Sequence, residues 1–339
     1  MYSVTAIFLS FVMLLAAAFG QALPLERLMP DQSPVSRGET RELPLFGGCD
    51  PWFYQYDGVY YHCYSVGNGV AVRAARDIAA LADAEGQVVY RAPRGTAYSE
   101  NWWAPELHCI NGRWYIYVAA DDGENANHRM YVLSCDTPTG QFVMEGKIAD
   151  PNDKWAIDGT VLNKDGSLWF IWSGWEGDTD EGQNLYIAPM DSPTHISGPR
   201  ALLSVPDKKW EKNGHAINEG PEVLQRDGHV YVVYSASGSW TDDYCLGMLR
   251  LAGGDPMNAK NWAKCPNPVF KAVDTAYGPG HCSFVTSVDG NTDYIVYHAN
   301  VNSGTGWSDR SVRVQRFFWL GGVPVFGKPL PAGSTVVLK

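Results

Sequence analysis

Long hydrophobic runs are almost missing from this chain, and the one that is present lies at its start. Residues 6–18 are nearly all apolar, but the run is too short to span a bilayer comfortably. Small residues follow, which indicates a signal peptide over residues 1–22 with cleavage after Gly20 or Ala22. The usual preceding positive charge is absent, so an uncleaved anchor is the alternative. We expect a secreted, extracellular protein that contacts no membrane after cleavage.

Positive charge is also scarce, since 26 Lys and Arg residues stand against 37 Asp and Glu residues. The formal net charge of −11 argues against nucleic acids and anionic membranes as partners. It also makes a polyanionic sugar backbone a poor ligand. A neutral glycan or a small neutral molecule is compatible with this charge.

Several reactive motifs are missing. The seven cysteines form no Cys-x-x-Cys pair, which argues against zinc and redox motifs. In a secreted chain we expect one or more disulfides, and the odd number leaves at least one thiol unpaired. There is no Gly-x-Ser-x-Gly motif and no phosphate-binding glycine loop. A serine nucleophile and a bound nucleotide are therefore not expected.

Helical periodicity is nearly absent, with one short candidate helix over residues 77–85. Elsewhere short apolar runs alternate with turn residues, which indicates an all-β fold. The runs 114–120 and 230–234 are apolar at consecutive positions, so we expect their strands to be buried on both faces. The Pro-rich residues 23–43 are interpreted as an N-terminal arm, and residues 44–339 as one domain.

Five short loops ending in glycine divide the chain into regular units, and each is followed by an aromatic-rich run. The glycines lie 54, 54, 62 and 62 residues apart and are Gly58, Gly112, Gly166, Gly228 and Gly290. Such a period, with strands and tight turns, is typical of a β-propeller, and five copies predict five blades. Each unit is interpreted as an inner strand, a tight turn and an aromatic second strand.

An acid or a histidine precedes each turn glycine by six to nine residues: Asp50, Glu106, Asp158, Glu219 and His281. Because inner strands line the propeller axis, we expect these side chains to converge on one axial site. Several carboxylates in one site suit cleavage of a glycosidic bond, where one carboxylic acid protonates the leaving oxygen and one carboxylate activates water or attacks the sugar. Like charges keep one member protonated near neutral pH.

Five motifs around these residues occur in chain order: Gly-Gly-Cys-Asp50-Pro, Trp-Ala-Pro-Glu106-Leu, Ala-Ile-Asp158-Gly-Thr, Asn-Glu219-Gly-Pro-Glu and Gly-Pro-Gly-His281. Together they resemble the family 43 glycoside hydrolases, five-bladed propellers that act on α-L-arabinofuranosides and β-xylosides. The resemblance spans residues 45–328. It implies an inverting hydrolase that requires no cofactor, with Asp50 as general base and Glu219 as general acid. Asp158 matches the third acid, which orients the general acid and raises its pKa.

Some assignments keep alternatives. Glu222 competes with Glu219, and strand alternation puts the two on opposite faces, while the resemblance favours Glu219. Glu106 is expected to bind sugar hydroxyls, with a purely structural carboxylate as the alternative. The resemblance puts His281 on the axis, near water or a structural Ca²⁺ ion that it meets through water. A simple buried, hydrogen-bonded histidine is the equal alternative.

The resemblance also suggests groups that bind substrate. Arg310 matches a family arginine that contacts the third acid, Asp158, and Arg313 and Arg316 compete for this position. Stacking on an aromatic face suits the apolar side of a sugar ring. Three tryptophans are candidate stacking platforms, with core packing as the alternative: Trp103, Trp175 and Trp240.

Segments 127–131, 171–176 and 234–241 resemble the α-L-arabinofuranosidase branch that trims arabinan from its end. The expected substrate is a neutral arabinose-containing oligo- or polysaccharide, cleaved at terminal 1,5-linked units by a monomer. A β-xylosidase of the same fold is the alternative enzyme. A non-catalytic glycan-binding propeller is the alternative from another class, and the presence of all three acids argues against it.

Overall fold

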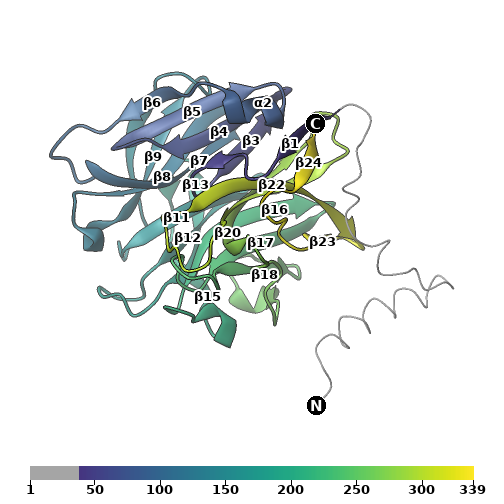
Figure 1. Ribbon diagram of the computed structural model, residues 1–339. Helices are drawn as coiled ribbons and strands as arrows, with labels where there is room; N and C mark the ends of the chain where they lie inside the picture. The colour runs from purple at the N-terminus through teal and green to yellow at the C-terminus, as the bar shows by residue number, and fades with distance from the viewer. Residues whose placement is uncertain (1–37) are drawn as a thin grey trace, which may run out of the picture. The chain divides into compact units, whose positions relative to one another are not determined.

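The computed structural model describes residues 38–339, which form an all-β, five-bladed propeller (Figure 1). The predicted signal peptide and most of the predicted arm lie outside the described residues. Helix α2 (Ile78–Asp83) confirms the expected helix, and the Asp77 side chain caps it by accepting a hydrogen bond from the Ala80 amide. No helix within residues 38–339 is long and apolar enough to cross a membrane.

Each blade is an antiparallel sheet. Blade 1 consists of β3 (Trp52–Tyr56), β4 (Val59–Ser65), β5 (Gly69–Ala75) and β6 (Gln87–Arg91). Blade 2 consists of β7 (Glu100–Ile110), β8 (Arg113–Asp121), β9 (Arg129–Cys135) and β10 (Val143–Ile148). Blade 3 consists of β11 (Ala156–Lys164), β12 (Ser167–Gly174), β13 (Asn184–Ser192), β14 (His195–Ile196) and β15 (Ala201–Ser204).

Blade 4 consists of β16 (Asn218–Arg226), β17 (His229–Ala236), β18 (Cys245–Leu251) and β19 (Trp262–Lys264). Blade 5 consists of β20 (Tyr277–Thr286), β21 (Asp293–Asn300), β22 (Arg310–Leu320), β23 (Val323–Val325) and the early strand β2 (Phe46–Gly47). The inner strands β3, β7, β11, β16 and β20 contact one another in a closed ring. Their first residues therefore meet at one end of the propeller, which we name the entry end.

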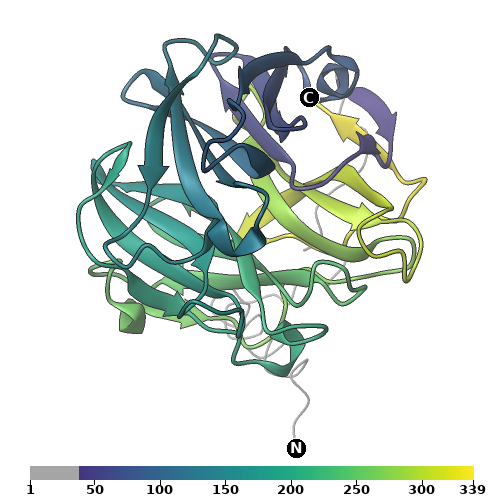
Figure 2. The same ribbon diagram turned by 90° about the vertical axis from the view of Figure 1, so that its left-hand side faces the viewer.

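The two ends of the described chain close this ring. Strand β2 pairs with β22, so blade 5 takes its outer strand from the N-terminal part of the chain. Strand β1 (Glu39–Glu42) pairs with β24 (Thr335–Leu338), and the two lie side by side in Figure 1. Figure 2 shows the purple first blade beside the yellow C-terminal strands. Residues 39–42, which we assigned to the arm, are thus part of the folded domain.

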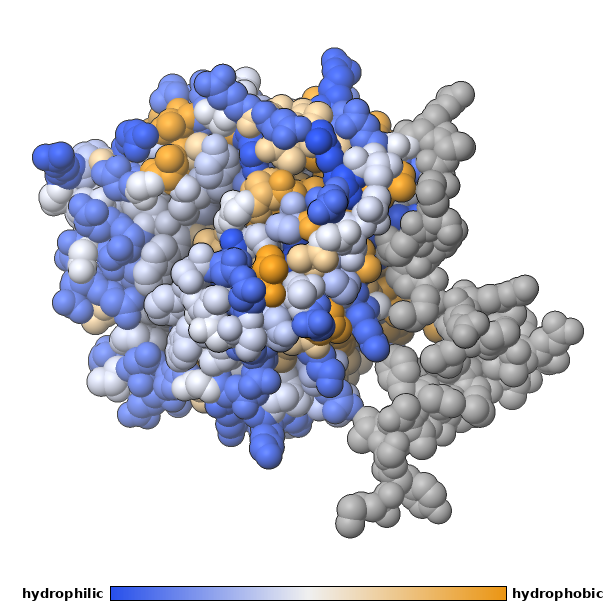
Figure 3. All heavy atoms as spheres, viewed as in Figure 1, coloured by the Kyte–Doolittle hydropathy of each residue, from blue (hydrophilic) through white to orange (hydrophobic). Residues whose placement is uncertain are grey.

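The hydrophobic core consists of five clusters, one at each contact between neighbouring blades. Strand β8 shows how consecutive apolar residues are used, because Ile116 packs toward blade 1 while Tyr117 packs toward blade 3. This confirms that the middle strands are buried on both faces. Polar side chains cover most of the face seen in Figure 3. All seven cysteines lie in the described part and are free thiols, so the expected disulfide does not form there.

Candidate active site

Each blade has a residue with left-handed backbone geometry in or just before its inner strand, at a matching distance from the turn glycine. It lies eight residues before the turn glycine in blades 1 to 4 and nine before it in blade 5. In blades 2 to 5 it also lies within a β-bulge of the inner strand. Because a bulge turns a side chain out of the regular alternation, the repeat itself aims side chains at the axis. The five residues are Asp50, Ala104, Asp158, Gly220 and His281.

The bulge in blade 4 corrects our expectation for Glu219 and Glu222. Glu219 lies opposite Ser235 of β17 and Glu222 lies opposite Val233, with the register shift between them. The two partners are two residues apart, so both glutamates face the same side of the sheet. Simple alternation was wrong here because the bulge inserts one extra residue. Both glutamates are buried.

Asp50 stands among three nitrogen-bearing side chains. Its Oδ1 atom lies 3.3 Å from His281 Nδ1, 3.4 Å from His298 Nδ1 and 3.6 Å from Arg310 Nη1. Burial opposes ionisation, but the interactions with His281, His298 and Arg310 outweigh it and hold the pKa of Asp50 well below its usual value. The Asp50 backbone amide donates to His298 Nδ1 at 3.1 Å, which fixes the ring orientation. Asp50 is therefore an ionised carboxylate at neutral pH.

Glu219 has the opposite character. Its side chain is buried and its Oε1 atom accepts one hydrogen bond, from the Tyr244 hydroxyl at 2.8 Å. Burial is the main cause that raises the pKa of Glu219 to about 7, while Tyr244 lowers it and the charge on Asp50 raises it again. Near neutral pH a large fraction of Glu219 therefore keeps its proton.

Asp158 connects the two. Its Oδ2 atom accepts a hydrogen bond from the Gly220 amide at 3.0 Å, which fixes the backbone directly after Glu219. Burial, and then the neighbouring Glu219 and Asp50, raise the pKa of Asp158 well above its usual value. Because neighbouring carboxylates resist simultaneous ionisation, Asp158 and Glu219 together retain a proton near neutral pH.

Glu106 belongs to a second layer, two residues further along the inner strands. There it lies near Thr160 and Glu222, and its Oε2 atom is 2.9 Å from His108 Nε2. Burial, followed by the charge of Glu222, raises the pKa of Glu106 well above its usual value. Among the described residues, Glu222 Oε2 has no hydrogen-bond partner. We name Glu106 and Glu222 the deep pair.

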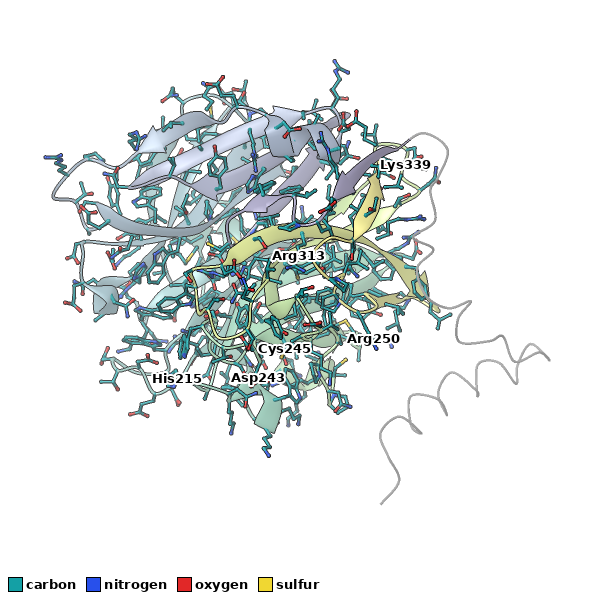
Figure 4. All side chains as sticks on the ribbon, in the orientation of Figure 1. His215, Asp243, Cys245, Arg250, Arg313 and Lys339 are labelled. Carbon is teal, nitrogen blue, oxygen red and sulfur yellow. The ribbon has the colours of Figure 1, made fainter. Side chains whose placement is uncertain are left out.

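Arg310 is the arginine that reaches the carboxylates, but its partner differs from the expected one. It pairs with Asp50, so the expected contact with Asp158 is wrong. Arg313, labelled in Figure 4, is buried on β22 and donates to the Leu330 and Asn300 carbonyls. Arg316 lies further along the same strand, opposite Tyr294 of β21.

The three candidate tryptophans divide into two groups. Trp103 is 39% exposed and stacks on His128 with the ring centroids 3.9 Å apart, and Trp240 is 41% exposed. Trp175 is only 5% exposed and stacks on Trp155 within the core between blades 2 and 3. Trp175 therefore packs in the core and has no open face for a sugar. The expectation that it is a stacking platform was wrong.

Two residues of the site were missed from the sequence, His298 and Tyr244. His298 is a polar residue inside the apolar run of β21, which is a signal that could have found it. Tyr244 carries no such signal, but Gly280 leaves it room: a Cβ atom there would lie 2.3 Å from Tyr244 Cε1. The Gly-Pro-Gly run before His281 thus admits the ring that binds Glu219.

Direct calcium ligation does not fit the side chains present. Within residues 38–339 no group of three or more His, Cys, Asp or Glu side chains is arranged to hold a metal ion. His281 Nδ1 instead faces Asp50. We therefore derive no step through an ion, and a water-mediated calcium ion stays a prediction.

An ionised carboxylate and a protonated carboxyl group at the axis of a five-bladed propeller define an acid–base glycoside hydrolase. The family model of glycosyl hydrolases family 43 matches residues 45–324, and the chain belongs to this family.

Named relatives agree with this membership. The chain is 37% identical over 323 residues to an extracellular exo-α-(1→5)-L-arabinofuranosidase of Streptomyces avermitilis, covering 90% of this chain and 67% of that protein. It is 36% identical to α-L-arabinofuranosidase 43 of Humicola insolens, covering 85% of this chain but only 63% of that protein. The crystal structure of an α-L-arabinofuranosidase from Lactobacillus brevis superposes with a TM-score of 0.81 at 34% identity, covering 86% of this chain and 98% of that one.

Proposed function

We propose that this protein is an inverting, exo-acting α-L-arabinofuranosidase that releases terminal arabinofuranose from 1,5-linked arabinan or a related arabinose-containing polysaccharide. The observation that carries the proposal is the opposite protonation of two neighbouring carboxyl groups. The pKa of Asp50 is held low, while that of Glu219 is raised to about 7. The names of the relatives support the choice of sugar. Glycosidases of this kind need one group in each state.

In the proposed reaction, Glu219 gives its proton to the glycosidic oxygen as the bond from that oxygen to the anomeric carbon breaks. Asp50 takes a proton from a water molecule whose oxygen forms the new bond to that carbon from the opposite face. The products are arabinose with inverted anomeric configuration and the shortened chain, which leaves with a free hydroxyl. Exchange with solvent restores the proton of Glu219 and removes the one on Asp50.

Neighbouring side chains position Asp50 and Glu219 for these proton transfers. Arg310 keeps Asp50 ionised through its permanent charge, His281 faces the carboxylate, and His298 accepts a hydrogen bond from the Asp50 backbone amide. Asp158 fixes the backbone after Glu219 and favours retention of the acid proton. Tyr244 orients the acid by the hydrogen bond that its hydroxyl donates to Glu219. These residues are positioning groups in the proposal, since they act through Asp50 or Glu219.

The stereochemistry of the first product tests the mechanism. The purified chain is mixed with 1,5-linked arabinobiose, and NMR follows the anomeric signal of the released arabinose before mutarotation. We expect the β-anomer from the α-linked substrate. Appearance of the α-anomer would remove Asp50 and Glu219 from the proposed roles. Release of xylose from xylobiose, without arabinose from arabinobiose, would replace the substrate with that of a β-xylosidase.

Three further expectations belong to the proposal. We propose that the protein is exported, as the name of the extracellular Streptomyces avermitilis relative suggests, and that it acts as a monomer. N-terminal sequencing of protein from the medium tests cleavage after Gly20 or Ala22, and light scattering measures the mass. A chelator that lowers the melting temperature would support a structural Ca²⁺ ion, and an unchanged melting temperature would contradict it.

A further inference from the structure

Exposed tryptophan is concentrated at the entry end. Of the 13 tryptophans, all within the described residues, three are exposed: Trp103, Trp240 and Trp307. Trp103 lies near the start of β7, Trp240 in the loop after β17, and Trp307 in the loop after β21. The ends of β17 and β21 lie opposite the starts of inner strands β16 and β20. All three rings therefore surround the end of the axis that carries Asp50 and Glu219.

Trp240 and Trp307 form one aromatic unit across two blades. Their rings are 5.8 Å apart in an edge-to-face arrangement, and Trp307 is 58% exposed. The Trp307 indole donates to Ser239 Oγ at 3.0 Å, which ties its ring to the loop of its partner. We name these two residues the tryptophan pair. Leaving two large apolar rings in water is unfavourable unless something covers them.

Hydrogen bonds hold the two loops in fixed positions. Asp242, in the loop of Trp240, accepts from the Gly304 amide at 3.0 Å and from the Ser303 hydroxyl. Asp309, in the loop of Trp307, accepts from the Val301 and Asn302 amides. The pair is thus a pre-formed surface rather than two independent side chains, and binding to it costs little ordering of the loops.

The ring of Trp240 also lies in a space kept open by glycine. A Cβ atom at Gly238 would lie 2.7 Å from Trp240 Cζ2, and one at Gly214 would lie 3.2 Å from Trp240 Nε1. Four residues after Trp240, the same loop reaches Tyr244, which donates to Glu219. The pair is therefore linked to the proposed acid through the loop of Trp240, which ends at Tyr244.

The position of the acid decides which part of a substrate comes here. The general acid protonates the leaving oxygen, so the leaving sugar lies on its side of the site. We propose that Trp240 and Trp307 bind the leaving arabinofuranose unit of the polysaccharide by stacking against its apolar face. This inference rests on the proposed function and deepens it, because it makes the pair the determinant of preference for a sugar as leaving group.

Two substrates separate this role from catalysis itself. 1,5-linked arabinobiose has a sugar as leaving group, whereas methyl α-L-arabinofuranoside has only a methyl group there. We expect Trp307→Ala and Trp240→Ala to lower kcat/KM for arabinobiose about tenfold, mainly through KM, because stacking acts on ground state and transition state alike. Hydrolysis of the methyl glycoside should change less than twofold, and Trp307→Phe should restore most of the arabinobiose rate.

Tyr56→Ala is the matched control. Tyr56 is 45% exposed and also makes an edge-to-face contact with a tryptophan, Trp114, but it lies at the opposite end of the propeller. It should leave both rates unchanged. Equal losses on both substrates, or no loss with arabinobiose, would overturn the role of the pair while leaving the proposed function intact. If the unmodified protein hydrolysed neither glycoside, the proposed function would fail, and this inference with it.

Discussion

Carboxyl groups at the propeller axis lie in two layers: an outer layer with Asp50, Asp158 and Glu219, and the deep pair. The layers differ in whether the pKa values of their members shift in the same direction. In the outer layer, the pKa of Asp50 is held low by His281, His298 and Arg310, while that of Glu219 is raised. In the deep pair, burial raises the pKa of both Glu106 and Glu222 well above the usual value. Within residues 38–339, no arginine or lysine is among the groups that shift the pKa of either member of the deep pair.

This difference in pKa shifts distinguishes carboxyl groups suited to catalysis from carboxyl groups suited to the core. The extent of burial does not distinguish them as well. Glu219, Glu106 and Glu222 are buried to a similar degree, and the Asp50 side chain is 21% exposed. Only the outer layer has environments that push two pKa values apart, which is what an acid and a base require at one pH. In the deep pair both members favour the neutral form, so the pair lacks the ionised base that proton transfer requires.

The largest expected effect compares two glutamates on one strand. Glu219→Gln removes the proposed proton donor and should lower kcat for arabinobiose by about 10²–10⁴-fold. Glu222→Gln keeps the shape of a carboxyl group that is already neutral, so kcat should fall less than about threefold. Steady-state kinetics gives both values, and melting curves show whether each variant is folded.

The contrast fails if the two variants lose activity equally while both remain folded. It is strengthened if Asp50→Asn matches the loss of Glu219→Gln, because the base and the acid act in one step. Glu106→Gln provides the second deep-pair variant, and its effect should resemble that of Glu222→Gln.

A smaller effect is expected from removing the charge of Arg310, which contacts Asp50 in the outer layer. Arg310 helps to hold the pKa of Asp50 low, so Arg310→Met should raise that pKa. The base is active when ionised, and the acidic limb of the kcat/KM profile should therefore move to higher pH, with activity falling about tenfold near pH 5. A pH profile from 4 to 8 measures this. An unmoved acidic limb would show that Arg310 does not control the base.

Much of this arrangement could be predicted from the sequence, because repeats report topology. The spacing of Gly58, Gly112 and the later turn glycines gave the blades, and the register gave Asp50, Asp158 and Glu219. The backbone conformation of the inner strands could not be predicted from this spacing. Of the left-handed residues that recur at one position in the five blades, four lie in bulges. A bulge changes the face on which the following side chains lie without changing the composition of the strand. For this reason Glu222 was expected on the wrong face.

Contacts between side chains of different blades could not be predicted from the sequence either. Arg310 meets Asp50 across 260 residues of chain, and only ring closure brings them together. Trp175 could not be assigned from the sequence for a different reason, because tryptophan suits both a sugar-binding surface and a hydrophobic core. Its stacking on Trp155 follows from the packing of blades 2 and 3, which no local pattern encodes.

The smallest expected effect concerns the hydrogen bond that tunes the acid. Tyr244 donates to Glu219 and so stabilises the ionised carboxylate, which lowers the pKa of Glu219 below the value that burial alone would give. Tyr244→Phe should therefore raise this pKa, and the alkaline limb of the kcat/KM profile should move from near 7 to higher pH. The maximal rate should fall only a few-fold, since the proton donor itself remains. A limb that moves to lower pH would mean that Tyr244 stabilises the protonated acid, and the asymmetry of the outer layer would then need another cause.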